Sequence, residues 1–250
     1  GRARELAQAL HEENARRREL EAQVFAQALA KVEAEADFLR QGALVVMGEG
    51  WNTGVIGLVA SRLAERFHFP ALVLSREGET CVGSARSIPG VNIYAMLDAC
   101  RDLFLRFGGH EQAAGLTMAA RDVPALSRRL SRAIREAYDS EVFLPKTRYD
   151  LELPLSVVTR EATEHLQALE PTGLANPAPV FLARDAQVQD MRPVGREGAH
   201  LQCALYQEGA LREAIAFGMG GLAGSMPPRV DVLFSPELNE WKGTVTPQCV

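Results

Sequence analysis

Glycine-rich stretches in the first half of the chain combine main-chain amides with side chains that suit phosphate groups. One is RFGGHEQAAG, residues 106–115. Gly108 and Gly109 have no Cβ, so their N–H groups can approach an anion closely, and a helical turn starting at His110 would add further free amides. The His110 imidazole can donate to a phosphate oxygen. The same residues are also explained by a helix that ends at a glycine C-cap and is followed by an exposed histidine. Both interpretations stay open.

A second stretch of this kind is GSARSIPG, residues 83–90. Ser84 and Ser87 supply hydroxyl groups, and Arg86 supplies a planar fork that matches phosphate oxygens. Strand alternation would place Ser84 and Arg86 on one face, with Gly83 and Ser87 on the other. An exposed strand arginine followed by a turn is the alternative. Two such stretches in one domain favour phosphate binding over two unrelated structural coincidences.

A third stretch, GEGWNTGVIG at residues 48–57, predicts a strand-to-helix turn. It is neither the dinucleotide fingerprint G-x-G-x-x-G nor the phosphate loop, which ends in a lysine. Trp51 and Asn52 lie where they could line a site. Core packing is the favoured role for Trp51, since a large aromatic side chain gains most from burial.

No catalytic or metal-binding residues are predicted in this chain. Its five histidines lack metal-ligand spacing, and the motifs H-E-x-x-H and G-x-S-x-G do not occur. Its four cysteines form no C-x-x-C pair, which argues against zinc or a disulfide framework and suits a reducing cytoplasm. The net charge of −5 means that nucleic-acid binding would need local arginine clusters. No apolar run reaches the ~18 residues of a membrane span.

Hydrophobic patterning divides the chain into three parts. Residues 1–38 contain no proline and predict one long helix, with too few large apolar residues for a core helix, that connects or leans across domains. Residues 39–142 alternate buried strands with amphipathic helices, which predicts an α/β domain. Within it, NIYAMLDACRDLFLRF at residues 92–107 predicts a helix that stops at the glycine pair.

Residues 143–250 are mostly β, with a strand at 149–158, a helix at 161–171 and about five short strands in all, so the OB-type barrel is the leading fold. Phe217 and Phe234 follow alternating patterns and are expected in the core. Tyr206 and Trp241, with Lys242 beside the latter, are the candidates for stacking on nucleic-acid bases.

Several of these motifs, in this order, resemble one family. EGWNTGVIGLVASRLAERFHFPALVLS, GSARSIPG and RFGGHEQAAGLTM resemble the DHH-associated domain of RecJ-type single-strand-specific exonucleases. LEPTGLANPAPVF, GAHLQCALY, AIAFG and NEWKG resemble the OB-fold domain that follows it, and NARRRELE resembles the connector helix before it. The resemblance covers nearly the whole chain. Asn52 departs from the pattern, where histidine is usual, and so does Ala175, where glycine is common.

The resemblance implies 5′→3′ degradation of single-stranded DNA in repair and recombination, with Mn²⁺ or Mg²⁺ held in an upstream DHH catalytic domain whose motifs this chain lacks. The chain would then be a piece of a longer protein: its substrate-binding portion, without a metal of its own and inactive alone. Its partners would be single-stranded DNA, the catalytic domain and DNA-repair proteins. DNA phosphates would meet Gly83, Ser84, Arg86, Ser87, Gly108, Gly109 and His110, with Asn52 nearby.

Two other functions stay open. One is a DHH-family phosphodiesterase acting on short oligonucleotides or cyclic dinucleotides, against which the OB-like region argues. The other is a RecJ-derived scaffold that has lost catalysis and docks partner proteins.

Overall fold

Two compact units make up the chain, residues 1–145 and 146–250. The computed structural model describes residues 1–34 and 42–250. The predicted end of the long helix, residues 35–38, and the predicted start of the α/β domain, residues 39–41, lie outside the described residues. No described helix is long and apolar enough to cross a membrane.

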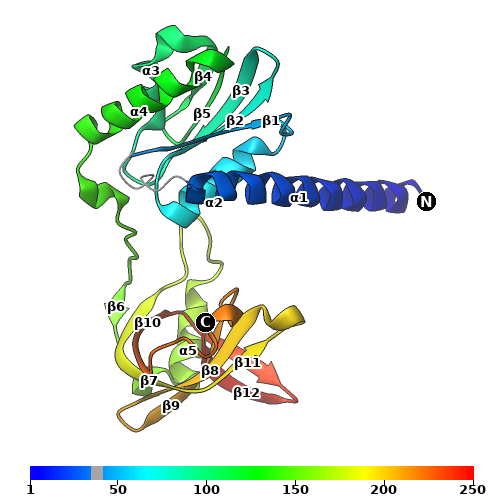
Figure 1. Ribbon diagram of the computed structural model, residues 1–250. Coiled ribbons are helices and arrows are strands. Elements are labelled where there is room, and N and C mark those ends of the chain that lie inside the picture. The colour runs from blue at the N-terminus through cyan, green and yellow to red at the C-terminus, as the bar shows by residue number, and fades with distance from the viewer. Residues whose placement is uncertain (35–41) are drawn as a thin grey trace. The chain divides into compact units, whose positions relative to one another are not determined.

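The first unit begins with helix α1 (Arg2–Ala34) and contains a five-stranded sheet. Its strands are β1 (Leu44–Glu49), β2 (Ala71–Glu77), β3 (Thr80–Arg86), β4 (Phe104–His110) and β5 (Ala113–Ala119), in the spatial order β1-β2-β3-β5-β4. Only β1 and β2 run parallel, and helix α2 (Ile56–Phe67) connects them. Helices α3 (Ile93–Asp98) and α4 (Val123–Ala137) complete the unit (Figure 1).

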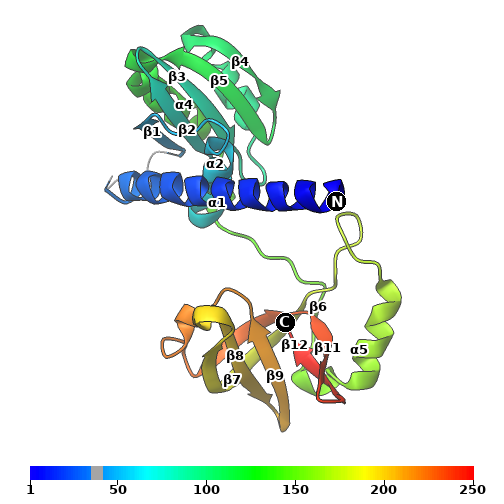
Figure 2. The ribbon, with the colours of Figure 1, turned by 90° about the vertical axis from the view of Figure 1, so that its right-hand side faces the viewer.

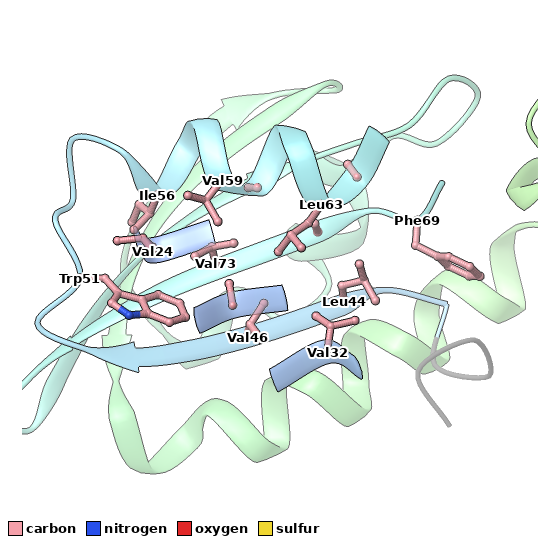
Figure 3. Close-up of a cluster of buried hydrophobic side chains, with 14 of the residues drawn as sticks. Val24, Val32, Leu44, Val46, Trp51, Ile56, Val59, Leu63, Phe69 and Val73 are labelled. Atoms are coloured by element: carbon pink, nitrogen blue, oxygen red, sulfur yellow. The ribbon is translucent and has the colours of Figure 1, made fainter. Parts of the chain in front are cut away.

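Apolar side chains fill both sides of this sheet near β1 and β2. On one side the C-terminal half of α1 and helix α2 pack against β1 and β2, burying Val24, Val32, Val59 and Leu63 (Figure 3). On the other side α3 and α4 cover Leu72, Leu74 and Leu116. The prediction that the long helix stays out of the core is therefore wrong for its C-terminal half, whereas Leu6 and Leu10 in its N-terminal half are exposed.

The helix predicted at residues 92–107 is wrong beyond α3. After Asp98 the chain makes a 3₁₀ turn at Arg101–Leu103 and continues as strand β4. Phe107 pairs with Leu116 on β5 and stacks on Tyr94, with ring centroids 4.9 Å apart. Cross-strand pairing and this aromatic contact outweigh the local helical period. Gly108 and Gly109 are therefore strand residues and cap no helix.

The second unit is a curled, seven-stranded half-barrel with one short helix, α5 (Arg160–Leu166), beside β11 and β12 (Figure 2). Its strands are β6 (Leu151–Glu152), β7 (Phe181–Val194), β8 (His200–Gln207), β9 (Ala210–Ala216), β10 (Arg229–Phe234), β11 (Pro236–Trp241) and β12 (Thr244–Cys249). The spatial order is β10-β7-β8-β9-β12-β11, and β6 pairs with β7.

The predictions for this unit need three corrections. The longest strand, β7, was not predicted, so the count of about five is too low. The strand expected at 149–158 ends at Glu152, because Pro154 cannot donate to a ladder and a 3₁₀ turn follows it. Phe217 is 61% exposed and lies just after β9, edge-on to His200, so it is not a core residue; Phe234 is buried as expected.

Candidate nucleic-acid interface

Strand pairing brings two of the predicted phosphate-binding stretches onto one face of the first unit's sheet. Gly115 on β5 pairs with Ser84 on one side and with Gly108 on the other. One row along, Arg86 and His110 both pair with Ala113 of β5. Residues directly opposite each other share a face, so β3 and β4 present these groups together about 10 Å apart, with one strand between them.

The same alternation extends one row further along the three strands. We call this face of β3, β5 and β4 the glycine shelf. It comprises Val82, Ser84, Arg86, Arg106, Gly108, His110, Ala113, Gly115 and Thr117.

The glycine shelf is open to solvent over β4 and β5. Helices α3 and α4 pack on the opposite face of the sheet, and α2 covers β2 and part of β3. Gly108, Gly115, His110 and Arg106 are accordingly exposed, while Leu116 between them in the alternation is buried. One face of this hairpin is thus fixed by the core, and the other is free to meet a ligand.

The two central glycines of the shelf are not required by internal packing. A Cβ built on Gly108 would meet nothing within 4 Å, and one built on Gly115 would come no closer than 3.9 Å, to the Gly83 carbonyl oxygen. Glycine inside an element costs roughly 0.5–1 kcal/mol relative to alanine. Such a residue often marks a place where a ligand or another backbone approaches closely.

Gly109 and Gly83 have a different role, since protein atoms occupy the space beside them. A Cβ on Gly109 would collide with the Ala113 carbonyl oxygen and lie 2.6 Å from the Ala114 Cα. A Cβ on Gly83 would lie 2.7 Å from a Leu74 methyl group, within the buried cluster. Both glycines therefore serve the packing of the sheet, and neither faces the shelf.

Close approach, and not a nest of free amides, is what the shelf glycines offer. The segment after Gly109 is the β4–β5 hairpin and not a helical turn, so it adds no helix-terminal N–H groups. Residues of β5 pair with neighbours on both sides, which uses main-chain hydrogen-bonding capacity. The donors that the structure places beside these glycines are side chains and a helix end.

Arg86 supplies the most clearly positioned donor group. Its Nη1 donates to the Ser84 hydroxyl oxygen at 2.9 Å and to the Ala85 carbonyl at 2.8 Å, and Nη2 lies over Gly57 of α2. A Cβ at Gly57 would be 2.8 Å from Nη2 and 3.1 Å from the Ser84 hydroxyl. No described carboxylate pairs with Arg86, so this fixed guanidinium keeps its positive charge for a ligand.

The N-terminus of α2 adds positive electrostatic potential near Arg86. Its N-cap residue, Val55, makes no side-chain capping bond, and no acidic residue occupies the first turn. Helix N-termini of this kind favour anions. Asn52 lies in the preceding turn, where its Oδ1 accepts from the Gly54 amide at 2.9 Å. The side chain of Asn52 therefore shapes the turn.

His110 and Ser87 differ in what they leave free. The Gln112 amide donates to His110 Nδ1 at 3.3 Å, which places the proton of a neutral imidazole on the exposed Nε2. The Ser87 hydroxyl donates to the Val91 carbonyl, and its amide donates to the Gln112 carbonyl at 2.9 Å. His110 thus presents a donor to solvent, whereas Ser87 holds the loop that follows β3.

In the second unit, Tyr206 and Trp241 are both exposed, at 39% and 70%. Tyr206 lies on β8. Trp241 ends β11, where Lys242 and Gly243 form the two-residue turn to β12. Strands β9 and β12 separate them in the sheet, so the register does not pair them directly.

In the first unit, Trp51 is buried as expected, and its Nε1 donates to the Gln27 side chain of α1 at 2.7 Å.

Arg106 and Gly57 are among the residues of the site that the sequence analysis missed. The spacing Arg106-Gly108-His110 is the i, i+2, i+4 pattern of one strand face. It would have pointed to Arg106 if the segment had been taken as a strand. Nothing in the sequence alone identifies Gly57, because its role depends on where α2 crosses Arg86.

No cluster of three or more metal-ligating side chains occurs among residues 1–34 and 42–250. All four cysteines are free thiols, and burial raises the pKa of each, to about 12 for Cys249. A thiol whose pKa is raised is a poor nucleophile at neutral pH. No described thiol is therefore poised for covalent chemistry.

Comparison with known proteins accounts for both units. Residues 40–136 match the DHHA1 domain, and residues 149–250 match the RecJ OB domain. The chain carries the DHHA1 and OB domains of RecJ-type proteins. The single-stranded-DNA-specific exonuclease RecJ of Bacillus subtilis is 35% identical over 250 residues, covering 98% of this chain and 32% of that protein. RecJ of Thermus thermophilus is 33% identical over 96% of this chain and 33% of its own length.

The chain thus spans about a third of the length of these RecJ relatives. Among solved structures, RecJ from Thermus thermophilus in complex with Mn²⁺ matches with a TM-score of 0.77 and 30% identity. That match covers 96% of this chain and 34% of the solved RecJ chain. A complex of the same protein with Mg²⁺ gives the same TM-score.

The glycine shelf predicts opposite outcomes for two adjacent glycines. Gly109→Ala should lower the free energy of unfolding of the first unit by at least ~2 kcal/mol, because the added methyl group collides with the main chain of β5. Gly108→Ala should leave it unchanged or slightly raised, because the methyl enters open space. Urea unfolding measures both. Equal losses would show that Gly108 is also a packing residue.

Proposed function

We propose that the chain binds single-stranded DNA on the glycine shelf and serves as the substrate-holding portion of a RecJ-type 5′→3′ exonuclease in DNA repair and recombination. Ser84, Arg86 and His110 contact backbone phosphates at one end of the shelf. Ser87 and Asn52 shape the loops on either side, and Gly83 and Gly109 allow the strands to pack. The sugar-phosphate chain lies over Gly108 and Gly115.

The observation that carries this proposal is that an added Cβ would meet nothing within 4 Å at Gly108 and nothing nearer than 3.9 Å at Gly115. Two directly paired glycines on an exposed face lower β-sheet stability without relieving any internal clash. A ligand that must approach the main chain closely explains why both positions are glycine. A flat, bare surface edged by cations suits the sugar-phosphate backbone, which positions nucleic acid without reading its sequence.

Local positive charge supports DNA binding on a chain whose net charge is −5. Arg86, the uncapped start of α2 and the outward Nε2 of His110 converge on one end of the shelf. Binding would therefore depend on a few fixed contacts and would weaken as salt rises. The second unit binds single-stranded DNA as well, with Trp241 and Tyr206 stacking on bases and Lys242 meeting a phosphate.

Catalysis in this proposal belongs to an upstream DHH domain that holds Mn²⁺ or Mg²⁺, because the described residues offer no metal-binding cluster. The chain contributes by holding the strand in position for that chemistry. We further propose that it works in the reducing cytoplasm, where four unpaired cysteines are stable. Contacts with DNA-repair proteins are part of the same proposal.

A dinucleotide phosphodiesterase is the nearest competing function, since a short ligand would also fit the shelf. The match of residues 149–250 to the RecJ OB domain favours longer strands. A strand of about 15 nucleotides, near the upper end of the OB site size, should bind much more tightly than a dinucleotide. Equal affinities would favour the phosphodiesterase.

Arg86→Gln tests the positive end of the shelf. We expect weaker binding of a fluorescent single strand, and a salt dependence (log K against log salt concentration) less steep by about 0.7, the value for one lost phosphate contact. Fluorescence anisotropy at several salt concentrations measures both.

The matched control for Arg86→Gln is Arg128→Gln, which removes the same charge from the exposed side of α4, on the opposite face of the sheet. Its affinity and salt dependence should equal those of the parent chain. If Arg86→Gln also leaves the salt dependence unchanged, the phosphate-binding role of Arg86 is wrong.

Trp241→Ala should weaken binding of the long strand by ~1–3 kcal/mol, because it removes a base-stacking surface that is 70% exposed and makes little internal packing. Trp241→Phe should recover most of the loss. Anisotropy titration, with circular dichroism to verify folding, gives the comparison. A folded Trp241→Ala variant with full affinity would remove Trp241 from the DNA site.

A further inference from the structure

Arg106 occupies the corner of the glycine shelf diagonally opposite Arg86. It lies on β4 two residues before Gly108 and pairs across the sheet with Thr117, which in turn pairs with Val82. Its side chain is exposed and forms no ion pair with any described residue. A free guanidinium at this position is available to an anion that crosses the shelf.

The distance between the two positive ends of the shelf is set by strand geometry. Arg106 and His110 are four residues apart on β4, which corresponds to about 13 Å, and β3 lies about 10 Å from β4. The paired glycines Gly108 and Gly115 fill the row between these ends. A single bound phosphate cannot contact both ends, whereas a strand lying over the bare row can.

The groups around Arg106 fit a phosphodiester. No carboxylate belongs to the nine residues of the shelf, so no shelf residue competes for the guanidinium. The Thr117 hydroxyl in the paired position can donate a second hydrogen bond, and Val82, 38% exposed, offers an apolar surface beside it. Arginine binds two phosphate oxygens at once, which orients as well as attracts the ligand.

We propose that Arg106 and Thr117 form a second phosphodiester subsite on the glycine shelf, separate from the one at Arg86. One unpaired strand crosses Gly108 and Gly115 and places different phosphates at the two subsites. This inference rests on the proposed function and goes beyond it in giving the strand a path and a minimum length. The arginines of α4 lie on the other face of the sheet and do not take part.

The test compares strands that can and cannot reach both ends. Arg106→Gln should weaken binding of a strand of about 15 nucleotides several-fold and make its salt dependence less steep by about 0.7. It should leave dinucleotide binding unchanged, because a dinucleotide is held at the Arg86 end. Arg86→Gln should weaken both ligands, and Arg128→Gln neither. Melting curves establish that each variant is folded.

The outcomes separate this inference from the proposed function. If Arg86→Gln weakens binding while Arg106→Gln behaves like the parent chain with long strands, the second subsite is wrong and the proposed function stands. If neither variant changes affinity or salt dependence, the shelf does not bind DNA and both proposals fail. If Arg106→Gln and Arg128→Gln cause equal losses, only net charge matters, and the second subsite is again wrong.

A second variant keeps the test independent of charge. Thr117→Val retains the strand-forming shape and removes the hydroxyl, so it should reduce affinity for the long strand but not for the dinucleotide. Thr117→Ser should restore the affinity for the long strand. Full affinity in a folded Thr117→Val variant would remove Thr117 from the subsite and contradict the proposal as stated.

Discussion

The pairing of Gly108 with Gly115 is the contact on which the whole interface depends. It leaves two adjacent strands without side chains at this position on an exposed face. The glycines therefore provide clearance, and the donors come from elsewhere: the Arg86 guanidinium, the imidazole of His110 and the first turn of α2. This division differs from a phosphate loop, in which the glycine amides themselves bind the anion.

The open face is usable because the opposite face is firmly packed. Leu72, Leu74 and Leu116 are almost fully buried beneath α3 and α4, and Gly83 lets Leu74 and Leu116 approach β3 closely. This packing fixes the register of β3 against β5, and with it the position of Arg86 relative to Gly115. A binding surface held by rigid strands keeps its geometry before the ligand arrives, which lowers the cost of ordering it on binding.

Much of this could be predicted from the sequence, and the errors have identifiable causes. The alternation of buried strands with amphipathic helices in residues 39–142 predicted the α/β unit, in which β1 and β2 are buried strands. The segment at 99–107 was taken as helix because Leu103 and Phe107 also fit a helical period; only its pairing with β5 shows that it becomes a strand. Arg106 was overlooked for the same reason. Gly57 and the corner that it shares with Arg86 depend on tertiary contact, which no local pattern encodes.

The most direct test of the central claim is the affinity of a Gly115→Val variant for single-stranded DNA, measured together with its melting temperature. Valine suits a strand, and a Cβ at position 115 would come no closer than 3.9 Å, to the Gly83 carbonyl oxygen, so the melting temperature should stay the same or rise. Its side chain would stand where the sugar-phosphate chain is proposed to lie, so affinity should fall at least ~10-fold, about 1.4 kcal/mol. A stable variant with unchanged affinity would contradict the account, because the bare row would then have no role in binding.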